Sequence, residues 1–371
     1  MYKIGLIVNP IAGMGGRVGL KGTDGREILQ KAKNLGAISL SPKRTSAALE
    51  PLSVIQGKLK LMTCPGDMGE NETISCGFVS DIINGIKSKE TTFADTQKAA
   101  RIIRDRGVDL LLFAGGDGTA RDIYIAIGTT LPVIGIPTGV KIHSAVFASS
   151  PSKAGELSLL YLQKRIHQLR EAEVMDIDEQ AFRNGIVKAR LFGYLKIPYE
   201  RRCIQGGKLG SSPSEEIIQK VIAEDIIESM DNDFLYIIGP GTTTRAIMQR
   251  LGLSYTLLGV DVVYRKEVIG LDLGESELLK LINKEKAKLI ITPIGGQGYI
   301  FGRGNQPLSP QVIRKVKRDN IIIIATNNKI VSLKGAPLLV DTGDLSLDRE
   351  LNGYMQIVTN YHERTAYRVK F

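Results

Sequence analysis

Residues 108–121 read VDLLLFAGGDGTAR, an apolar strand pattern that runs into glycines and then into the start of a helix. Glycines let the backbone approach a phosphate without a Cβ in the way. Free N–H groups at a helix start attract an anion. Asp117 is unusual there because a carboxylate repels phosphate, and an acceptor hydroxyl or a ligand-bound metal would explain it. A turn with Asp117 and Thr119 capping the helix explains the same residues without a ligand.

Strand and helix patterns alternate around this segment. Apolar runs predict strands at 3–8, 58–63 and 132–136. Polar starts with apolar residues at helical spacing predict helices at 24–35, 95–106 and 122–127. This alternation predicts an N-terminal α/β domain over residues 1–150, with a doubly wound, mostly parallel sheet. Such sheets bind ligands at the carboxyl ends of their strands, where Gly115 and Gly135 lie.

The pattern of apolar and polar residues changes after residue 150. A long helix is expected over 153–171, followed by short apolar stretches between Val174 and Tyr199 that fit strands better than helices. Further strands are expected at 234–238, 257–264, 289–294, 321–325 and 354–358. We therefore expect a second, strand-rich α+β domain over residues 151–371. The sequence leaves open whether its last segment crosses back onto the first domain.

Composition excludes several classes of function. The charge of +10 arises from 49 basic and 39 acidic residues and suits an anionic ligand, but the basic residues are scattered and Trp is absent. A base-stacking nucleic-acid surface is therefore not expected. Three Cys without a CxxC pair and three His do not predict a zinc site. No apolar run is long enough to span a membrane, and the N-terminus reads as a strand, so we expect a cytoplasmic protein with no membrane partner.

Three other glycine-rich segments are candidate ligand loops. GIPTGVKIHS at 135–144 offers Lys141 as a point charge for a polyphosphate, whereas His143 fits a structural role equally well. GPGTTTR at 239–245 precedes a helix, and one of its threonines is expected to be the N-cap. The stretch 294–307 embeds Arg303 and Asn305 in a dense glycine pattern, which favours a ligand-facing loop over a plain surface loop.

The GGDGT run at 115–119, after a buried strand, resembles the signature of the superfamily that joins NAD kinases, diacylglycerol kinases and sphingosine kinases. VNPIAG at 8–13 is similar to the first strand and loop of those kinases. DFLYIIGPGTTTRA at 233–246 resembles a second-domain segment that lines the nucleotide site of NAD kinases, although it is one residue short after the proline. The chain looks most like the ATP-NAD kinase-like branch that includes AcoX-type proteins.

The resemblance implies roles for individual residues. Asp117 would be the catalytic base that activates the acceptor hydroxyl. The residues expected to contact nucleotide or phosphate are Asn9, Gly115, Gly116, Gly118, Thr119, Thr138, Gly139, Lys141, His143, Gly241, Thr243, Thr244 and Arg245. The resemblance also implies Mg²⁺ bound with ATP, a donor that is ATP or polyphosphate, NAD as the acceptor, and a homo-oligomer.

One departure from the family pattern concerns the acceptor. Typical NAD kinases carry an Asn-Glu pair beyond the GGDGT segment that holds the NAD ribose, but Asn71-Glu72 precedes the motif here. Asp176 and Asp178 alternate on an expected strand and would face the same side, as ribose contacts or as surface charge. A kinase for another nucleotide, a sugar or a lipid headgroup, and a non-catalytic nucleotide-binding regulator, therefore stay open.

Overall fold

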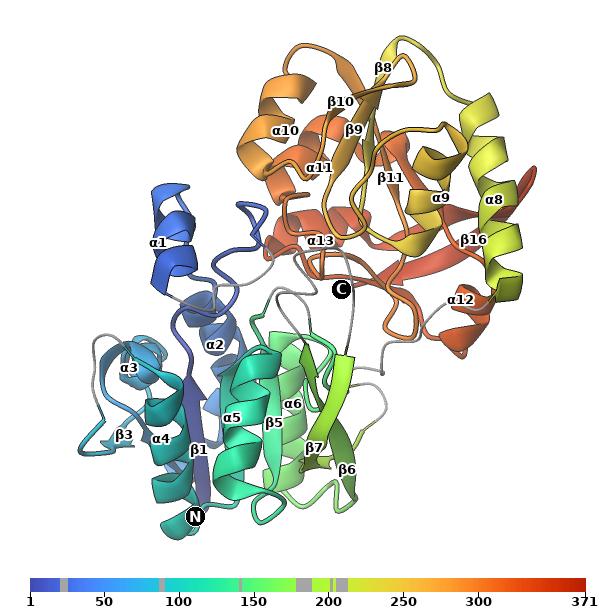
Figure 1. The fold of residues 1–371 in the computed structure, drawn as a ribbon. Coiled ribbons are helices and arrows are strands. Elements are labelled where there is room, and N and C mark those ends of the chain that lie inside the picture. Colours follow the sequence, from blue (N-terminus) through green and yellow to red (C-terminus); the bar gives the residue numbers. More distant parts are fainter. Residues whose placement is uncertain (21–25, 87–90, 140–141, 178–188, 201–202, 205–212) are drawn as a thin grey trace. The chain divides into compact units, whose positions relative to one another are not determined.

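Residues 1–20, 26–86, 91–139, 142–177, 189–200, 203–204 and 213–371 are described in a computed structural model of the chain. The chain forms two units (Figure 1). Unit 1 comprises residues 1–14, 22–34 and 38–206, and unit 2 comprises residues 15–21, 35–37 and 207–371. No helix within the described ranges is long and apolar enough to cross a membrane.

The described elements of unit 1 alternate between strands and helices. In chain order they are β1 (Tyr2–Val8), α1 (Arg26–Asn34), α2 (Ser41–Leu49), η1 (Glu50–Lys58), β2 (Leu59–Thr63), η2 (Gly66–Met68), α3 (Glu70–Ser75), β3 (Ser80–Ile82), α4 (Phe93–Asp105), β4 (Leu110–Gly115), α5 (Asp117–Ile127), β5 (Val133–Pro137), α6 (Pro151–Leu162), β6 (Leu169–Ile177) and β7 (Ala189–Pro198). Strands β1 to β5 form a parallel sheet in the order β3-β2-β1-β4-β5.

The strands of this sheet are apolar on both faces because helices cover both. Alternate residues of β4 point to opposite sides: Leu111 and Phe113 join one core cluster, and Leu110 and Leu112 join the other. Helices α4 and α5 cover the first cluster, whereas α2 and α6 cover the second (Figure 1). The predicted doubly wound α/β sheet is confirmed.

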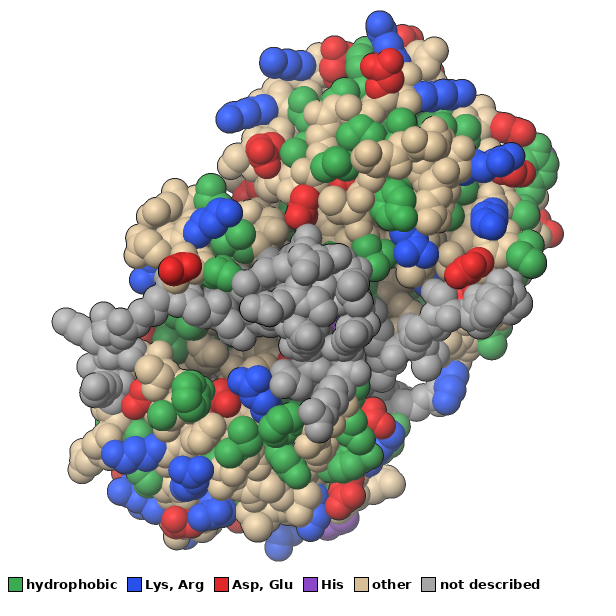
Figure 2. Space-filling model, viewed as in Figure 1, with side chains coloured by type: hydrophobic (Ala, Val, Ile, Leu, Met, Phe, Trp, Pro, Cys, Tyr) green, Lys and Arg blue, Asp and Glu red, His purple; other side chains and the backbone are tan. Residues whose placement is uncertain are grey.

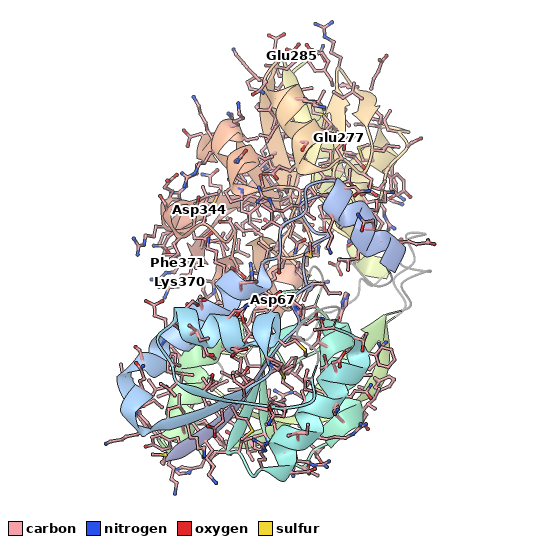
Figure 3. All side chains as sticks on the ribbon, turned by 90° about the vertical axis from the view of Figure 1, so that its left-hand side faces the viewer. Asp67, Glu277, Glu285, Asp344, Lys370 and Phe371 are labelled. Atoms are coloured by element: carbon pink, nitrogen blue, oxygen red, sulfur yellow. The ribbon has the colours of Figure 1, made fainter. Side chains whose placement is uncertain are left out.

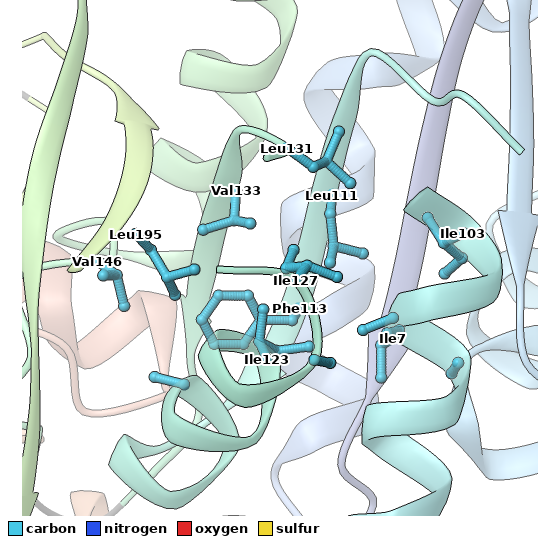
Figure 4. Close-up of a cluster of buried hydrophobic side chains, with 14 of the residues drawn as sticks. Ile7, Ile103, Leu111, Phe113, Ile123, Ile127, Leu131, Val133, Val146 and Leu195 are labelled. Carbon is cyan, nitrogen blue, oxygen red and sulfur yellow. The ribbon is translucent and has the colours of Figure 1, made fainter. Parts of the chain in front are cut away.

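Unit 1 extends past the boundary expected near residue 150. Strands β6 and β7 pair antiparallel, and their Val174 and Leu195 are fully buried in the same cluster as Phe113 and Ile123. Figure 4 shows Leu195 beside Phe113. The helix expected over 153–171 ends at Leu162, and Lys164 then adopts a positive φ of 57°. The chain turns there so that β6 can begin at Leu169 and return along the core.

Unit 2 is built around a mixed sheet. Its described elements are α8 (Pro213–Glu228), β8 (Phe234–Ile238), α9 (Thr242–Arg250), β9 (Asp261–Tyr264), β10 (Glu267–Gly270), α10 (Glu275–Ile282), β11 (Lys286–Ile291), β12 (Tyr299–Phe301), α11 (Pro310–Val316), η3 (Arg318–Asn320), β13 (Ile321–Ile324), α12 (Asn327–Ser332), β14 (Leu338–Val340), α13 (Leu345–Leu351), β15 (Gly353–Asn360) and β16 (Glu363–Lys370). In the described part of the chain, nine strands pair in the order β10-β9-β8-β11-β13-β15-β16-β14-β12. The predicted strand-rich second domain is confirmed, and the last segment, β15 to β16, pairs within this sheet.

Charged side chains are dispersed over the face shown in Figure 2. Figure 2 shows Lys and Arg side chains interspersed with acidic and hydrophobic ones over the visible face, rather than gathered in one stripe. A basic stripe is the usual electrostatic footprint of a nucleic-acid-binding protein.

Candidate active site at the carboxyl edge of the unit 1 sheet

Neighbouring strands β1 and β4 lead to helices on opposite faces of the unit 1 sheet. Helix α2, which lies between β1 and β2 in the chain, packs into one core cluster through Ala48 and Leu49. Helix α5, which follows β4, packs into the other through Ala120 and Ile123. Such a switch point leaves a crevice outside the carboxyl ends of the two strands, where open α/β sheets bind ligands. The segments that begin at Asn9 and Gly115 both start there.

Asp117 is held at this edge by the loop that follows β5. Its carboxylate is buried, with 9% of the residue exposed. Oδ2 accepts a hydrogen bond from the backbone N–H of His143 at 2.8 Å, and Oδ1 accepts one from that of Ser144 at 2.9 Å. The His143 Nδ1 atom also lies 3.5 Å from Oδ2. Two amide donors therefore fix the orientation of the carboxylate in the first turn of α5.

Two glycines let the loops after β4 and β5 cross closely. A Cβ on Gly139 would lie 2.7 Å from the Cα of Gly116, and a Cβ on Gly116 would lie 3.2 Å from the Cα of Gly139. The carbonyl of Gly115 accepts hydrogen bonds from the N–H groups of Thr138 and Gly139, both at 3.0 Å. Because backbone meets backbone, neither loop has a flexible side chain that could give way. This crossing brings the amides of His143 and Ser144 to Asp117.

The two sides of the switch point are also joined by side chains. Asn9 Nδ2 donates to Thr119 Oγ1 at 3.0 Å, and Asn9 Oδ1 accepts from the N–H of Ile11 at 3.2 Å. Position 115 next to this pair must be a glycine, since a Cβ there would lie 2.3 Å from Thr119 Oγ1. Thr138 Oγ1 is buried and has no hydrogen-bond partner among the described residues. An unsatisfied buried hydroxyl beside a glycine loop is the kind of group that a ligand completes.

Several residues expected from the sequence are thereby brought together in unit 1. They are Asn9, Gly115, Gly116, Asp117, Gly118, Thr119, Thr138, Gly139 and His143. Lys141 and Asp178 lie outside the described residues. Asp176 belongs to β6, in register with Arg190, and its side chain lies outside the description.

The remaining expected residues gather at the start of α9 in unit 2. Gly241 has a φ of 142° and precedes the helix, and Thr243 and Thr244 are fully buried. The Thr244 hydroxyl donates to the carbonyl of Gly241 at 3.0 Å, so it serves the helix start itself. Arg245 lines a cavity of about 500 Å³ between α8 and α9, beside Gln219.

Arg303 and Asn305, in the glycine-rich stretch 294–307 of unit 2, are both buried. Arg303 is 4% exposed, lies over the ring of Tyr299 at 4.8 Å and has its Nε 3.4 Å from Asp341 Oδ2. Asn305 Nδ2 donates to the carbonyl of Ile300 at 2.8 Å. Both side chains therefore make contacts within unit 2, and their role as ligand-facing residues stays a prediction.

Glu72 is a buried acid in unit 1 that the sequence argument did not select. It is 3% exposed, and its Oε2 has no hydrogen-bond partner within the described ranges. Burial raises the pKa of Glu72 from 4.5 to about 7; its own backbone N–H opposes the rise, and the negative charge of Asp67, labelled in Figure 3, adds to it. Composition gave no signal for this acid, because only tertiary packing buries it.

Glu72 predicts a pH-dependent stability. Below pH 4.5 this acid is protonated in both the folded and the unfolded chain and does not affect the free energy of unfolding. As the pH rises from 4.5 through about 7, the unfolded chain loses the proton first, so the free energy of unfolding falls. We expect Glu72→Gln to match the unaltered chain at pH 4.5 and to be more stable by about 2–4 kcal/mol at pH 8. Urea unfolding at both pH values measures the difference, with the exposed Glu50→Gln as control. An equal difference at the two pH values would contradict it.

The site fits a metal ion that arrives with a ligand. No group of three or more His, Cys, Asp or Glu in the described part of the chain could hold a metal ion. Magnesium usually needs only one or two protein carboxylates, and substrate phosphates and water complete its shell. Asp117 places two carboxylate oxygens beside the start of α5, where a phosphate is favoured. These residues fit magnesium bound with a polyphosphate.

Comparison with known proteins gives the following matches. Residues 4–166 match the ATP-NAD kinase N-terminal domain, and residues 231–369 match the ATP-NAD kinase C-terminal domain. No curated protein matches. Two solved structures described as "a putative diacylglycerol kinase" from Bacillus anthracis str. Sterne match at 16% identity, with TM-scores of 0.26 and 0.25. Each match covers 48% of this chain and 46% of the solved chain, and at these TM-scores neither supports a conclusion.

Proposed function

Because the chain belongs to the ATP-NAD kinase family, we propose that it transfers the terminal phosphoryl group of ATP, or of polyphosphate, to the 2′-hydroxyl of the adenosine ribose of NAD, which gives NADP. One observation carries the proposal: a buried carboxylate, Asp117, is fixed by two amides at the switch point of a parallel sheet. A helix that only needed an N-cap would not require a second loop to orient this carboxylate.

The transfer needs a base and a phosphate cradle. The 2′-oxygen attacks the terminal phosphorus, its proton passes to the Asp117 carboxylate, and the bond to the bridging oxygen of ADP breaks, so that ADP leaves with that electron pair. A carboxylate has about four lone-pair sites, and the amides of His143 and Ser144 occupy two. The others remain for the hydroxyl proton and for magnesium, which would neutralise charge on the phosphate oxygens.

The neighbouring residues position the phosphate. Gly116 and Gly118 flank Asp117 where the free amides of α5 point outward, and the helix dipole favours an anion there. Thr119 and Thr138 add hydroxyl groups at the same edge. Such fixed donors stabilise the charge that spreads over the transferred phosphoryl group without reorganising during the reaction.

A coupled assay tests the proposal. The purified chain is incubated with NAD, magnesium and either ATP or polyphosphate, and NADP is measured with an NADP-specific dehydrogenase. We expect NADP to accumulate with at least one donor. If no NADP forms but ATP is consumed with another hydroxyl metabolite from a panel, the protein is a kinase whose acceptor is not NAD. Nucleotide binding without any transfer would point to a non-catalytic regulator and reject the kinase.

A further inference from the structure

A cavity in unit 2 lies between two helices that cover the same face of its sheet. Helices α8 and α9 are neighbours (Figure 1), and both pack into one core cluster, α8 through Ile222 and Ala223 and α9 through Ala246 and Ile247. The cavity between them has a volume of about 500 Å³, within the usual range of small-molecule sites, about 300–1,000 Å³. It is therefore large enough for a small metabolite.

A buried amide of α8 lines this cavity without a partner. Gln219 is 2% exposed and lies one turn before Ile222 and Ala223, on the side of α8 that packs into the core. Its Nε2 atom is buried and has no hydrogen-bond partner among the described residues. Glu215, one turn earlier on the same side, is buried as well, but it accepts a hydrogen bond from Thr326 at 2.7 Å. A buried donor without an acceptor is rare in native proteins, so Gln219 calls for an acceptor inside the cavity.

A second donor lines the same cavity from α9. The Nε atom of Arg245 is also buried without a hydrogen-bond partner in the described part of the chain. Because Gln219 Nε2 and Arg245 Nε are both donors, neither atom satisfies the other, and an oxygen acceptor would satisfy each. Lys220 adds a second positive charge to the wall of the cavity. These groups favour an anionic ligand.

The rest of the wall favours a single carboxylate on an apolar body. Ala246, Leu253 and Tyr255 supply apolar surface, and Tyr255 Oη already accepts a hydrogen bond from Gln249 Nε2 at 3.1 Å. Glu216 contributes a negative charge to the same wall, which disfavours a dianion such as phosphate. A carboxylate carries one charge, and each of its two oxygens can accept from a fixed donor.

We propose that this cavity binds a small monocarboxylate metabolite, with Gln219 and Arg245 donating to the carboxylate and the apolar wall holding the remainder of the molecule. The site is distinct from the segment that resembles a nucleotide-site lining, because Gln219 lies outside residues 233–246. The glycine and threonines at 241–244 are not among the described residues that line the cavity. Binding there requires no transfer at Asp117, so the site goes beyond the proposed function.

The test measures binding rather than turnover. Calorimetry titrates benzoate and hexanoate, which are monocarboxylates with an aromatic and an aliphatic body, into the full chain. Benzamide has the shape of benzoate without its charge. We expect at least one of the two acids to bind, and benzamide to bind at least about tenfold more weakly than benzoate, because the charge-assisted hydrogen bonds are lost. Hydrogen exchange of residues 216–220 and 245–249 reports where the acid binds.

Matched variants test the buried donor. Gln219→Leu keeps the size of the side chain and is expected to weaken binding of the acid at least about tenfold, since a hydrogen bond to a charged group is lost. It should also raise the midpoint of thermal unfolding of the ligand-free chain, because a buried donor without an acceptor is removed. Gln311→Leu, at an exposed glutamine of α11, is the control and should bind as the unaltered chain does.

The outcomes separate this site from the kinase proposal. Weaker binding by Gln219→Leu than by Gln311→Leu, with added protection at 216–220 in the unaltered chain, supports the site even if no NADP forms. Equal binding by the two variants, or displacement of the acid by ATP, overturns it even if NADP does form. Absence of binding of both acids by the unaltered chain also overturns it. If Gln219→Leu unfolds, Arg245→Met, which removes the other donor, decides alone.

Discussion

Replacing Asp117 by Asn is expected to reduce NADP formation by about 10²–10⁴-fold, the range that a positioned general base contributes. The amide cannot take the hydroxyl proton, while the size of the side chain barely changes. Both carboxylate oxygens accept backbone N–H groups, from His143 and Ser144, so the amide NH₂ of Asn would face one of these donors. We therefore also expect a loss of stability of about 1–3 kcal/mol, because one buried amide loses its acceptor.

The measurement must separate these two effects. The coupled assay gives kcat, thermal unfolding gives the folded fraction at the assay temperature, and calorimetry gives the affinity for ATP. We expect a folded protein that retains ATP binding and has lost turnover. Asp105→Asn, at an exposed carboxylate of α4, is the matched control. A kcat for Asp117→Asn within tenfold of the unaltered value would show that Asp117 is not the base.

The second large effect is expected from Gly139→Ala, a change that removes no polar group. The new methyl would lie 2.7 Å from the Cα of Gly116, so the loops after β4 and β5 must separate. This separation draws the amides of His143 and Ser144 away from Asp117. A displacement of about 1 Å at a catalytic group costs on the order of 10²-fold in rate. Overpacking at a backbone crossing is expected to cost about 1–3 kcal/mol of stability.

A glycine in open space provides the comparison. A Cβ on Gly57, in η1 of the same unit, meets nothing within 4 Å, so Gly57→Ala should leave kcat unchanged. Urea unfolding and the coupled assay are run on both variants. If Gly139→Ala lost stability but kept its kcat, the crossing would serve the fold only, and orientation of Asp117 by the loop after β5 would not limit the reaction.

Local pattern was sufficient to predict the strand before Gly115, the alternation of elements in unit 1 and the parallel sheet. These features depend on apolar runs, helix starts and glycines that are adjacent in the chain, where each residue constrains its neighbours. The same locality explains why the helix expected over 153–171 was too long. Its apolar spacing continues past Leu162, and only packing of β6 against the core cluster requires the chain to turn.

The sequence by itself determined the family resemblance, the α/β fold and the choice of Asp117 as the candidate base, because these are carried by contiguous segments. Only the tertiary structure decided what surrounds them. It brought the amides of His143 and Ser144 to Asp117, turned Arg303 into the core of unit 2, and buried Glu72. It also brought Gln219 and Arg245 to one cavity. Such contacts join residues tens of positions apart, and they arise from how helices cover a sheet rather than from any pattern along the chain.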